Sequence, residues 1–148
     1  MRDKACEGLR GRAGVVILAG MDLLEQARRV IEIERDGLAR MAGRLDESFG
    51  RAVEILGETL RRRGKIVVVG IGKSGNIGHK IAATFNSTGA VAVVLHSQNA
   101  LHGDLGVLAD GDAVIALSYS GETAELINLL PHIKRFDVRL IGLTGRVN

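Results

Sequence analysis

Two hydrophobic patterns divide the chain near residue 64. Between residues 22 and 63, apolar side chains recur at helical spacing, which predicts amphipathic helix with breaks at Gly43 and Gly50. Gly64 is the expected C-cap of the last helical turn. After it, continuous apolar runs alternate with further helical patterns. The runs at residues 65–70, 90–95, 113–117 and 138–143 predict strands buried on both faces, which is typical of a parallel sheet.

The segments between these runs predict the fold class. Ile77, Ile81 and Phe85 share one face of a predicted helix, and residues 121–135 predict another. Strands that alternate with helices indicate an α/β fold with right-handed crossovers and helices on both faces of the sheet, here preceded by N-terminal helices. The sequence ends five residues after the fourth predicted strand. We therefore expect an incomplete sheet whose open edge favours aggregation or dimerisation.

Composition narrows the classes of partner. The 148 residues include 20 glycines and one proline, with 3% aromatic residues and a formal net charge of +3. Few aromatic residues and no basic arm argue against a nucleic-acid partner. The single cysteine, Cys6, excludes an internal disulfide and is consistent with a cytoplasmic protein. The apolar run at residues 13–20 is too short to span a membrane, so residues 1–20 are expected to form an unstructured extension.

Candidate chemistry gathers after the predicted strands. Ligands of open α/β sheets bind beyond the carboxyl ends of the strands. After the third strand, Ser118, Ser120 and Thr123 place three hydroxyls at the start of a helix, and Gly121 lets the backbone approach a ligand closely. The helix N-terminus favours an anion, so this loop is a candidate phosphate cradle. The alternative is that Ser120 is only the N-cap of the helix.

The loop after the first strand contains Lys73. Gly70, Gly72 and Gly75 match the dinucleotide-binding fingerprint, but no carboxylate follows the second strand to bind a ribose. We therefore expect no nicotinamide cofactor. A lysine in a glycine-flanked turn is a candidate ligand-binding cation, or else a surface residue.

Three further side chains are candidates for acid–base chemistry. His96 and His102 belong to the loop after the second strand, where a metal ligand, an acid–base group and an ordinary loop residue are all open. With no cysteine nearby and no histidine at helical spacing, a structural zinc site is not expected. Glu125 either complements the dipole of its helix or serves as a general base beside the phosphate cradle.

Together these motifs resemble the sugar isomerase (SIS) domain, and within it the D-arabinose 5-phosphate isomerase family. The resemblance covers residues 21–148 and is carried by Gly-Lys-Ser-Gly at 72–75, His-Gly-Asp-Leu-Gly at 102–106 and Ser-Tyr-Ser-Gly-Glu-Thr-Ala-Glu at 118–125. It implies an SIS-type three-layer sandwich, a cytoplasmic and commonly tetrameric enzyme, and interconversion of D-arabinose 5-phosphate and D-ribulose 5-phosphate for lipopolysaccharide synthesis.

The resemblance also implies roles for individual residues. Lys73, Glu125 and His102 match catalytically relevant positions, and His96 matches a position where a divalent metal binds without being required. Substrate-contacting positions match Ser74, Gly89, Ala90, His96, His102, Ser118, Ser120, Gly121 and Thr123. The family's closing segment, two further catalytic residues and its tandem CBS pair lie beyond residue 148. We therefore expect these 148 residues to form a weak or inactive isomerase, and the alternatives are a non-catalytic sugar-phosphate-binding module and an inactive truncated paralogue.

Overall fold

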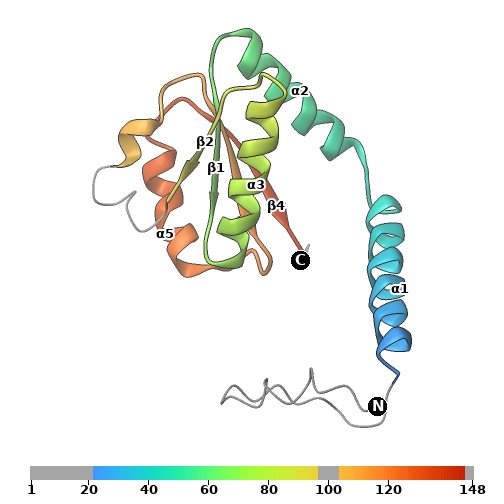
Figure 1. Cartoon of the computed structure of the whole chain (residues 1–148). Helices are drawn as coiled ribbons and strands as arrows, with labels where there is room; N and C mark the ends of the chain where they lie inside the picture. Colours follow the sequence, from blue (N-terminus) through green and yellow to red (C-terminus); the bar gives the residue numbers. More distant parts are fainter. Residues whose placement is uncertain (1–21, 97–103, 146–148) are drawn as a thin grey trace, which may run out of the picture. The chain divides into compact units, whose positions relative to one another are not determined.

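The computed structural model describes residues 22–96 and 104–145, and the chain divides into two compact units (Figure 1), Met1–Leu45 and Asp46–Asn148. The described part of the first unit is dominated by α1 (Leu23–Ala42). The Asp22 side chain caps this helix by accepting a hydrogen bond from the Leu24 N–H at 3.0 Å. The helix ends at Gly43, which confirms the predicted break. None of the residues of α1 is buried.

The second unit begins with α2 (Glu47–Arg61). Its N-cap is Asp46, whose carboxylate accepts a hydrogen bond from the Ser48 N–H at 2.8 Å. This bond and the one from the Ser48 hydroxyl hold the pKa of Asp46 below its usual value. The predicted break at Gly50 is wrong, because the helix runs through this residue. The start of α2 is set by its N-cap, Asp46, and not by a second glycine.

The end of α2 corrects the expected C-cap. Arg62 is the C-cap, and Arg63 rather than Gly64 takes the left-handed conformation, with φ of 64°. The Arg63 N–H donates to the Leu60 carbonyl and the Gly64 N–H donates to the Thr59 carbonyl, which is a Schellman motif. Gly64 is needed for a different reason. A Cβ at this position would lie 2.6 Å from the Gly111 carbonyl oxygen, so glycine permits α2 to end against the start of a neighbouring strand.

Four parallel strands follow the order β2-β1-β3-β4. They are β1 (Ile66–Gly70), β2 (Ala92–Leu95), β3 (Ala113–Ser118) and β4 (Arg139–Thr144). All four predicted strands are confirmed, although β2 begins two residues later than predicted. In register, Ile66 lies opposite Ala92 on one side and Ala113 on the other. The central strands β1 and β3 are almost wholly buried, which explains their continuous apolar runs.

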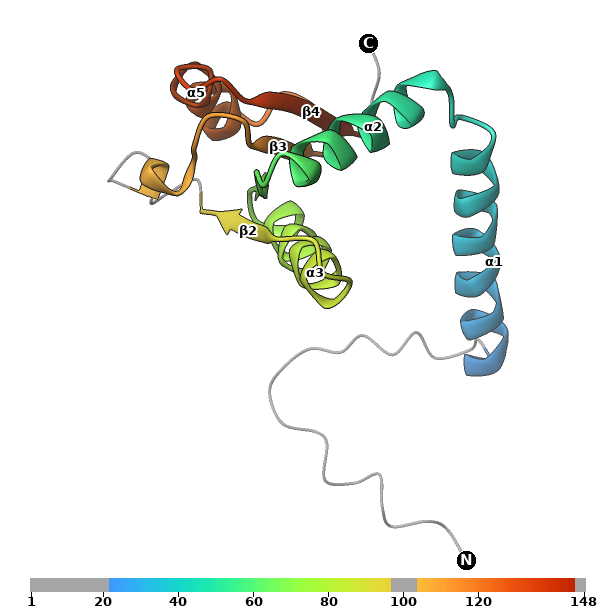
Figure 2. The ribbon, with the colours of Figure 1, turned by 90° about the horizontal axis from the view of Figure 1, so that it is seen from above.

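Helices cover both faces of this sheet, as Figure 2 shows from above. Ile66 and Val68 pack on one face with residues of α2 and of α3 (Lys73–Ser87). Val67 and Val69 pack on the other face with α5 (Ala124–Ile133) and residues of the short helix η2 (Asp104–Val107). The arrangement confirms the three-layer α/β sandwich. None of the helices that the structure describes is long and apolar enough to span a bilayer.

The last two elements differ from the rest of the core. The helix predicted at 121–135 begins at Ala124, because residues up to Thr123 form the turn that precedes it. The edge strand β4 is largely exposed, with Leu140 and Leu143 at 38% and 50% of their full exposure. Apolar side chains at an uncovered sheet edge are suited to contact with further polypeptide.

Candidate functional site

The strand order gathers the predicted loops along one edge. The carboxyl ends lie in the order β2, β1, β3, β4, so the loops that follow them appear in the same order. The chain leaves β1 toward β2 on one side and returns to β3 on the other. This makes the gap between the ends of β1 and β3 the topological switch point, where open α/β sheets bind ligands. Gly70 of β1 pairs with Leu117 of β3, which places the turns containing Lys73 and Ser118 side by side.

The β1–α3 turn depends on close backbone contacts. A Cβ at Gly70 would lie 2.9 Å from the Ser74 carbonyl oxygen, and one at Gly75 would lie 3.0 Å from the Gly70 oxygen. Gly72 has φ of 56° and precedes α3 without a side-chain cap. Lys73 is therefore the first residue of the helix and is exposed, while Ser74 is half-buried. The glycines make a tight turn that places Lys73 at the start of α3, beside the switch point.

The β3–α5 turn holds its hydroxyl groups in a fixed network. The Ser118 Oγ lies 2.9 Å from the Thr123 Oγ1, and it also accepts a hydrogen bond from the Gly121 N–H at 3.0 Å. Gly121 adopts φ of 76°, a left-handed conformation that glycine reaches without strain. The Ser120 Oγ accepts from the Glu122 N–H at 3.1 Å. The turn is thus closed by its own side chains before any ligand binds.

Thr123, not Ser120, is the N-cap of α5, which corrects the alternative interpretation of Ser120. No side-chain hydrogen bond caps this helix. The first N–H groups of a helix have no partners within it, so here they remain able to bind an anion. Glu125 lies in the first turn of α5 and is exposed.

The end of β4 braces this turn from the far side. The Gly145 N–H donates to the Tyr119 carbonyl at 3.1 Å. A Cβ at Gly145 would lie 2.6 Å from the Tyr119 ring, so only glycine permits this contact. Thr144 lies against Gly121, with its Cγ2 3.7 Å from the position of a Cβ there. Two adjacent strands therefore fix the shape of the hydroxyl-rich turn.

A histidine that sequence reasoning missed lies beside the end of β2. The His79 ring of α3 and the His96 ring have centroids 5.1 Å apart with planes tilted by 44°. The two residues are 17 positions apart, and only the packing of α3 against β2 brings them together. Among the described residues, no group of three or more histidine, cysteine or acidic side chains could hold a metal ion. By itself the pair therefore offers at most two ligands to a metal ion.

Two other predictions fall elsewhere. His102 lies outside the described residues. Gly89 and Ala90 follow α3 at the edge where the strands begin, so the structure does not bring them together with Lys73 in one chain. Of the predicted residues, the carboxyl edge gathers those of the β1–α3 and β3–α5 turns, together with His96.

Comparison with known proteins agrees with this geometry. The SIS domain profile matches residues 59–148. The chain is 46% identical over 125 residues to arabinose 5-phosphate isomerase KdsD of Pseudomonas aeruginosa, covering 84% of this chain and 37% of the relative. The Escherichia coli K12 enzyme of the same name is 43% identical over 132 residues, covering 89% and 39%. The chain therefore spans less than two fifths of the length of these curated relatives.

Solved structures share the fold. A Listeria monocytogenes protein provisionally assigned as a sugar-phosphate isomerase superposes with a TM-score of 0.78 at 36% identity, covering 86% of this chain and 67% of that one. An Escherichia coli CFT073 protein in complex with A5P gives 0.72 at 36% identity, covering 85% and 67%. The profile match covers more than half of the sequence, and the chain belongs to the SIS domain family.

Proposed function

We propose that this chain carries the sugar-phosphate site of an isomerase that interconverts D-arabinose 5-phosphate and D-ribulose 5-phosphate. The observation that supports this most directly is the pre-formed turn of Ser118–Thr123 at the N-terminus of α5, next to Lys73 at the switch point. The named relatives are arabinose 5-phosphate isomerases, and one solved neighbour holds A5P, which we take to be the same sugar phosphate.

The β3–α5 turn would bind the phosphate group. Its hydroxyls can each donate a hydrogen bond to a phosphate oxygen, and the uncapped helix N-terminus adds backbone N–H donors. The turn itself contains no cationic side chain, so the helix dipole and these donors must stabilise the charge. Because the phosphate does not react, its binding energy can orient the sugar carbons at the reacting centre.

The reaction moves a proton between two carbons. A base removes the proton from C2 of the aldose while the C1 oxygen gains one, which gives an enediol. A proton then returns to C1, and the C2 hydroxyl loses its own to become the ketone. Lys73 would stabilise negative charge that develops on the oxygens. Glu125 and His102 are the candidates within this chain for proton transfer or ring opening.

His96 is also a candidate ligand for a divalent metal ion, now together with His79. Two imidazoles with ring centroids 5.1 Å apart can share one cation if water or substrate completes its coordination. Proton transfer through an enediol uses no metal, so we propose that the metal is not required.

We further infer that the chain is cytoplasmic and works as a homo-oligomer, with the tetramer as the expected state. Apolar residues of α1 are exposed within a single chain, among them Leu23, Val30, Ile31 and Leu38 at 72%, 54%, 65% and 62%. Apolar residues that recur at helical spacing form one face of a helix, and such a face is suited to packing against a second helix. Light scattering after size-exclusion chromatography would measure the assembly, and a monomer would refute this part of the proposal.

Turnover with a matched pair of lysine variants tests the activity. The formation of D-ribulose 5-phosphate from D-arabinose 5-phosphate would be followed for the wild type, Lys73→Met and Lys80→Met. Lys80 is also exposed on α3 but lies two turns from the switch point. We expect weak turnover, which Lys73→Met should abolish and Lys80→Met should preserve. Substrate binding without turnover in the wild type would instead indicate a non-catalytic sugar-phosphate-binding module.

A further inference from the structure

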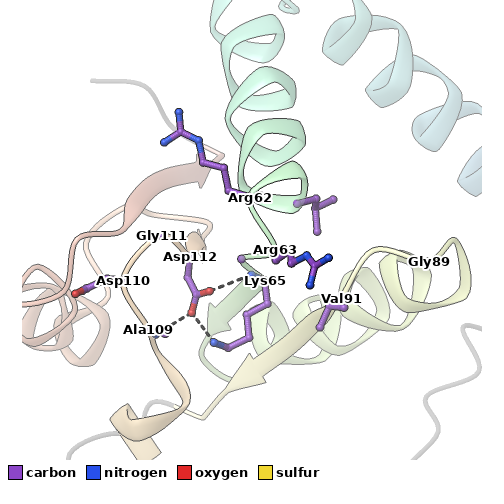
Figure 3. Close-up of a pocket in the computed structure, with 11 residues that line it drawn as sticks. Arg62, Arg63, Lys65, Gly89, Val91, Ala109, Asp110, Gly111 and Asp112 are labelled. Atoms are coloured by element: carbon purple, nitrogen blue, oxygen red, sulfur yellow. Dashed lines mark hydrogen bonds and ion pairs between the residues drawn. The ribbon is translucent and has the colours of Figure 1, made fainter.

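A pocket of about 510 Å³ lies at the edge of the sheet opposite to the proposed substrate site (Figure 3). It is formed where β1, β2 and β3 begin, at the end of α2 and just after the end of α3. Its size falls within the range of small-molecule sites in proteins. Three apolar side chains, Leu60, Val91 and Ala109, contribute to its lining, together with several charged ones.

A buried ion pair holds one side of this pocket. The Lys65 Nζ donates to the Asp112 Oδ2 at 2.6 Å, and the Lys65 backbone N–H donates to the other carboxylate oxygen at 3.0 Å. The Ala109 N–H adds a third bond at 2.8 Å. Burial raises the pKa of Asp112, but these bonds outweigh it and the pKa is lowered, so the group stays ionised. Lys65 uses only one of its three ammonium hydrogens on this carboxylate.

Arg63 supplies a cation that no acidic group neutralises. Among the residues that the structure describes, its guanidinium forms no ion pair and no side-chain hydrogen bond. Its side chain extends toward Val91, whereas that of Arg62 extends in another direction (Figure 3). The left-handed conformation of Arg63 and the close contact of Gly64 with Gly111 fix the backbone from which this side chain projects.

The donors that remain unpaired around the pocket favour an anion. Arg63 and Lys65 are balanced in number by Asp110 and Asp112, while the Arg62 side chain extends in another direction. The Asp112 carboxylate is already satisfied by three donors, and that of Asp110 accepts from the Asp137 N–H at 2.9 Å. Arg63 and the remaining donors of Lys65 are therefore the groups left to bind a ligand.

We propose that this pocket binds a small organic oxyanion, with Arg63 contacting its carboxylate or phosphate group and Leu60 and Val91 contacting its apolar part. The pocket lies at the edge of the sheet opposite to the proposed substrate site of the same chain, although Gly89 in its lining is one of the positions for which the resemblance implies substrate contact. Its existence does not depend on the proposed isomerase activity. It is also connected to that site through the fold. β1 leads from Lys65 to the turn of Lys73, and α3 leads from Lys73 back to the pocket at Gly89. A ligand here is thus placed to act as an effector.

Amide chemical-shift mapping of the full chain tests the proposal, with benzoate and phenyl phosphate as probes and benzyl alcohol as the neutral control. We expect both anions to shift the amides of Gly64, Val91 and Gly111 in a saturable manner, and the alcohol to leave them unchanged. Binding of phenyl phosphate to the proposed phosphate cradle would shift the amide of Gly121, which is far from this pocket in the sequence and at the opposite edge of the sheet. Failure of the substrate site is therefore separate from failure of this one.

Two variants assign the binding to Arg63. Arg63→Gly removes the guanidinium at a position whose conformation glycine prefers, so the fold is retained. Arg61→Gln is the matched control, because Arg61 is exposed at the same helix end and does not line the pocket. Arg63→Gly loses a charged hydrogen bond to the anion, so its affinity for the probe anions should fall by roughly 10- to 100-fold. For Arg61→Gln the affinity should change by less than about twofold, because no contact with the anion is lost. Absence of pocket shifts with either anion, or equal affinities of the two variants, would overturn the proposal.

Discussion

The hydroxyl oxygens of Ser118 and Thr123 lie 2.9 Å apart across the turn that joins β3 to α5. Ser118 is 5% exposed and is the last residue of its strand, while Thr123 is the N-cap of the helix. The contact therefore links the buried sheet directly to the helix end that would bind phosphate. It means that the geometry of the proposed anion site is set by the core and not by the ligand.

Removal of hydroxyls from this turn is expected to weaken substrate binding. The double variant Ser120→Ala, Thr123→Ala should bind D-arabinose 5-phosphate less tightly by about 1.5–3 kcal/mol for each hydrogen bond to the phosphate that is lost. Calorimetric titration would measure the change. Ser87→Ala is the control. This exposed serine is the last residue of α3, and its hydroxyl donates a hydrogen bond to the Thr84 carbonyl. Equal affinities of the double variant and the control would exclude the turn as the phosphate site.

The pair of Lys65 and Asp112 is expected to make stability depend on pH. The pKa of Asp112 is lowered from its usual 3.8, so its stabilisation is fully present above pH 4 and is lost as the pH falls through the lowered pKa. At pH 7, Asp112→Asn should reduce the free energy of unfolding by about 1.5–3 kcal/mol, because a charged hydrogen bond is lost.

Urea denaturation at pH 7 and at pH 2.5 would measure this effect. The difference between wild type and Asp112→Asn should shrink at the lower pH, which lies below the usual pKa of 3.8, because protonation then favours the unfolded chain. Asp137→Asn provides the comparison, because Asp137 is exposed and its carboxylate takes part in no hydrogen bond or ion pair in the described structure. A difference that stays constant between the two pH values would contradict the assigned ionisation of Asp112.

Two glycines of the α2 region should respond to alanine in opposite directions. Gly64→Ala places a Cβ 2.6 Å from the Gly111 carbonyl oxygen, and such overpacking should destabilise the chain by about 1–3 kcal/mol. Gly57→Ala meets nothing within 4 Å in the middle of the helix and should stabilise it by up to about 1 kcal/mol. Thermal unfolding monitored by circular dichroism compares them. Unchanged stability of Gly64→Ala would show that the close approach of Gly64 and Gly111 is not required, and destabilisation by Gly57→Ala would contradict the open space at that position.

The sequence predicts the fold well because its signals are local. An unbroken run of β-branched residues marks β1, a continuous apolar run marks β3, and the glycine turn after β1 marks the start of α3. Helix ends are predicted less well. Gly50 lies inside α2, and Arg63 occupies the conformation expected for Gly64, because capping by Asp46 and contact with Gly111 decide these positions. The contact of Gly64 with Gly111 is tertiary and leaves no trace in local composition, whereas the Asp46 cap is a local signal that the break predicted at Gly50 overlooks.

The residues of the candidate site also differ in how far the sequence alone predicts them. The hydroxyls of Ser118, Ser120 and Thr123 are recognisable because they follow one strand and precede one helix. The pairing of His79 with His96 depends on how α3 packs against β2, and no spacing in the sequence predicts it. The pocket at Arg63 and Lys65 likewise combines segments that are about 25 and 45 residues apart in the chain, which only the sheet brings together.

The most direct test of the proposed function is calorimetric titration of the wild-type chain with D-arabinose 5-phosphate and, separately, with D-arabinose. The hydroxyl-rich turn and the uncapped end of α5 would bind the phosphate group, so the sugar phosphate should bind and the free sugar should give no measurable heat of binding. Binding of both sugars with similar affinity, or of neither, would contradict the assignment of this edge of the sheet as a sugar-phosphate site.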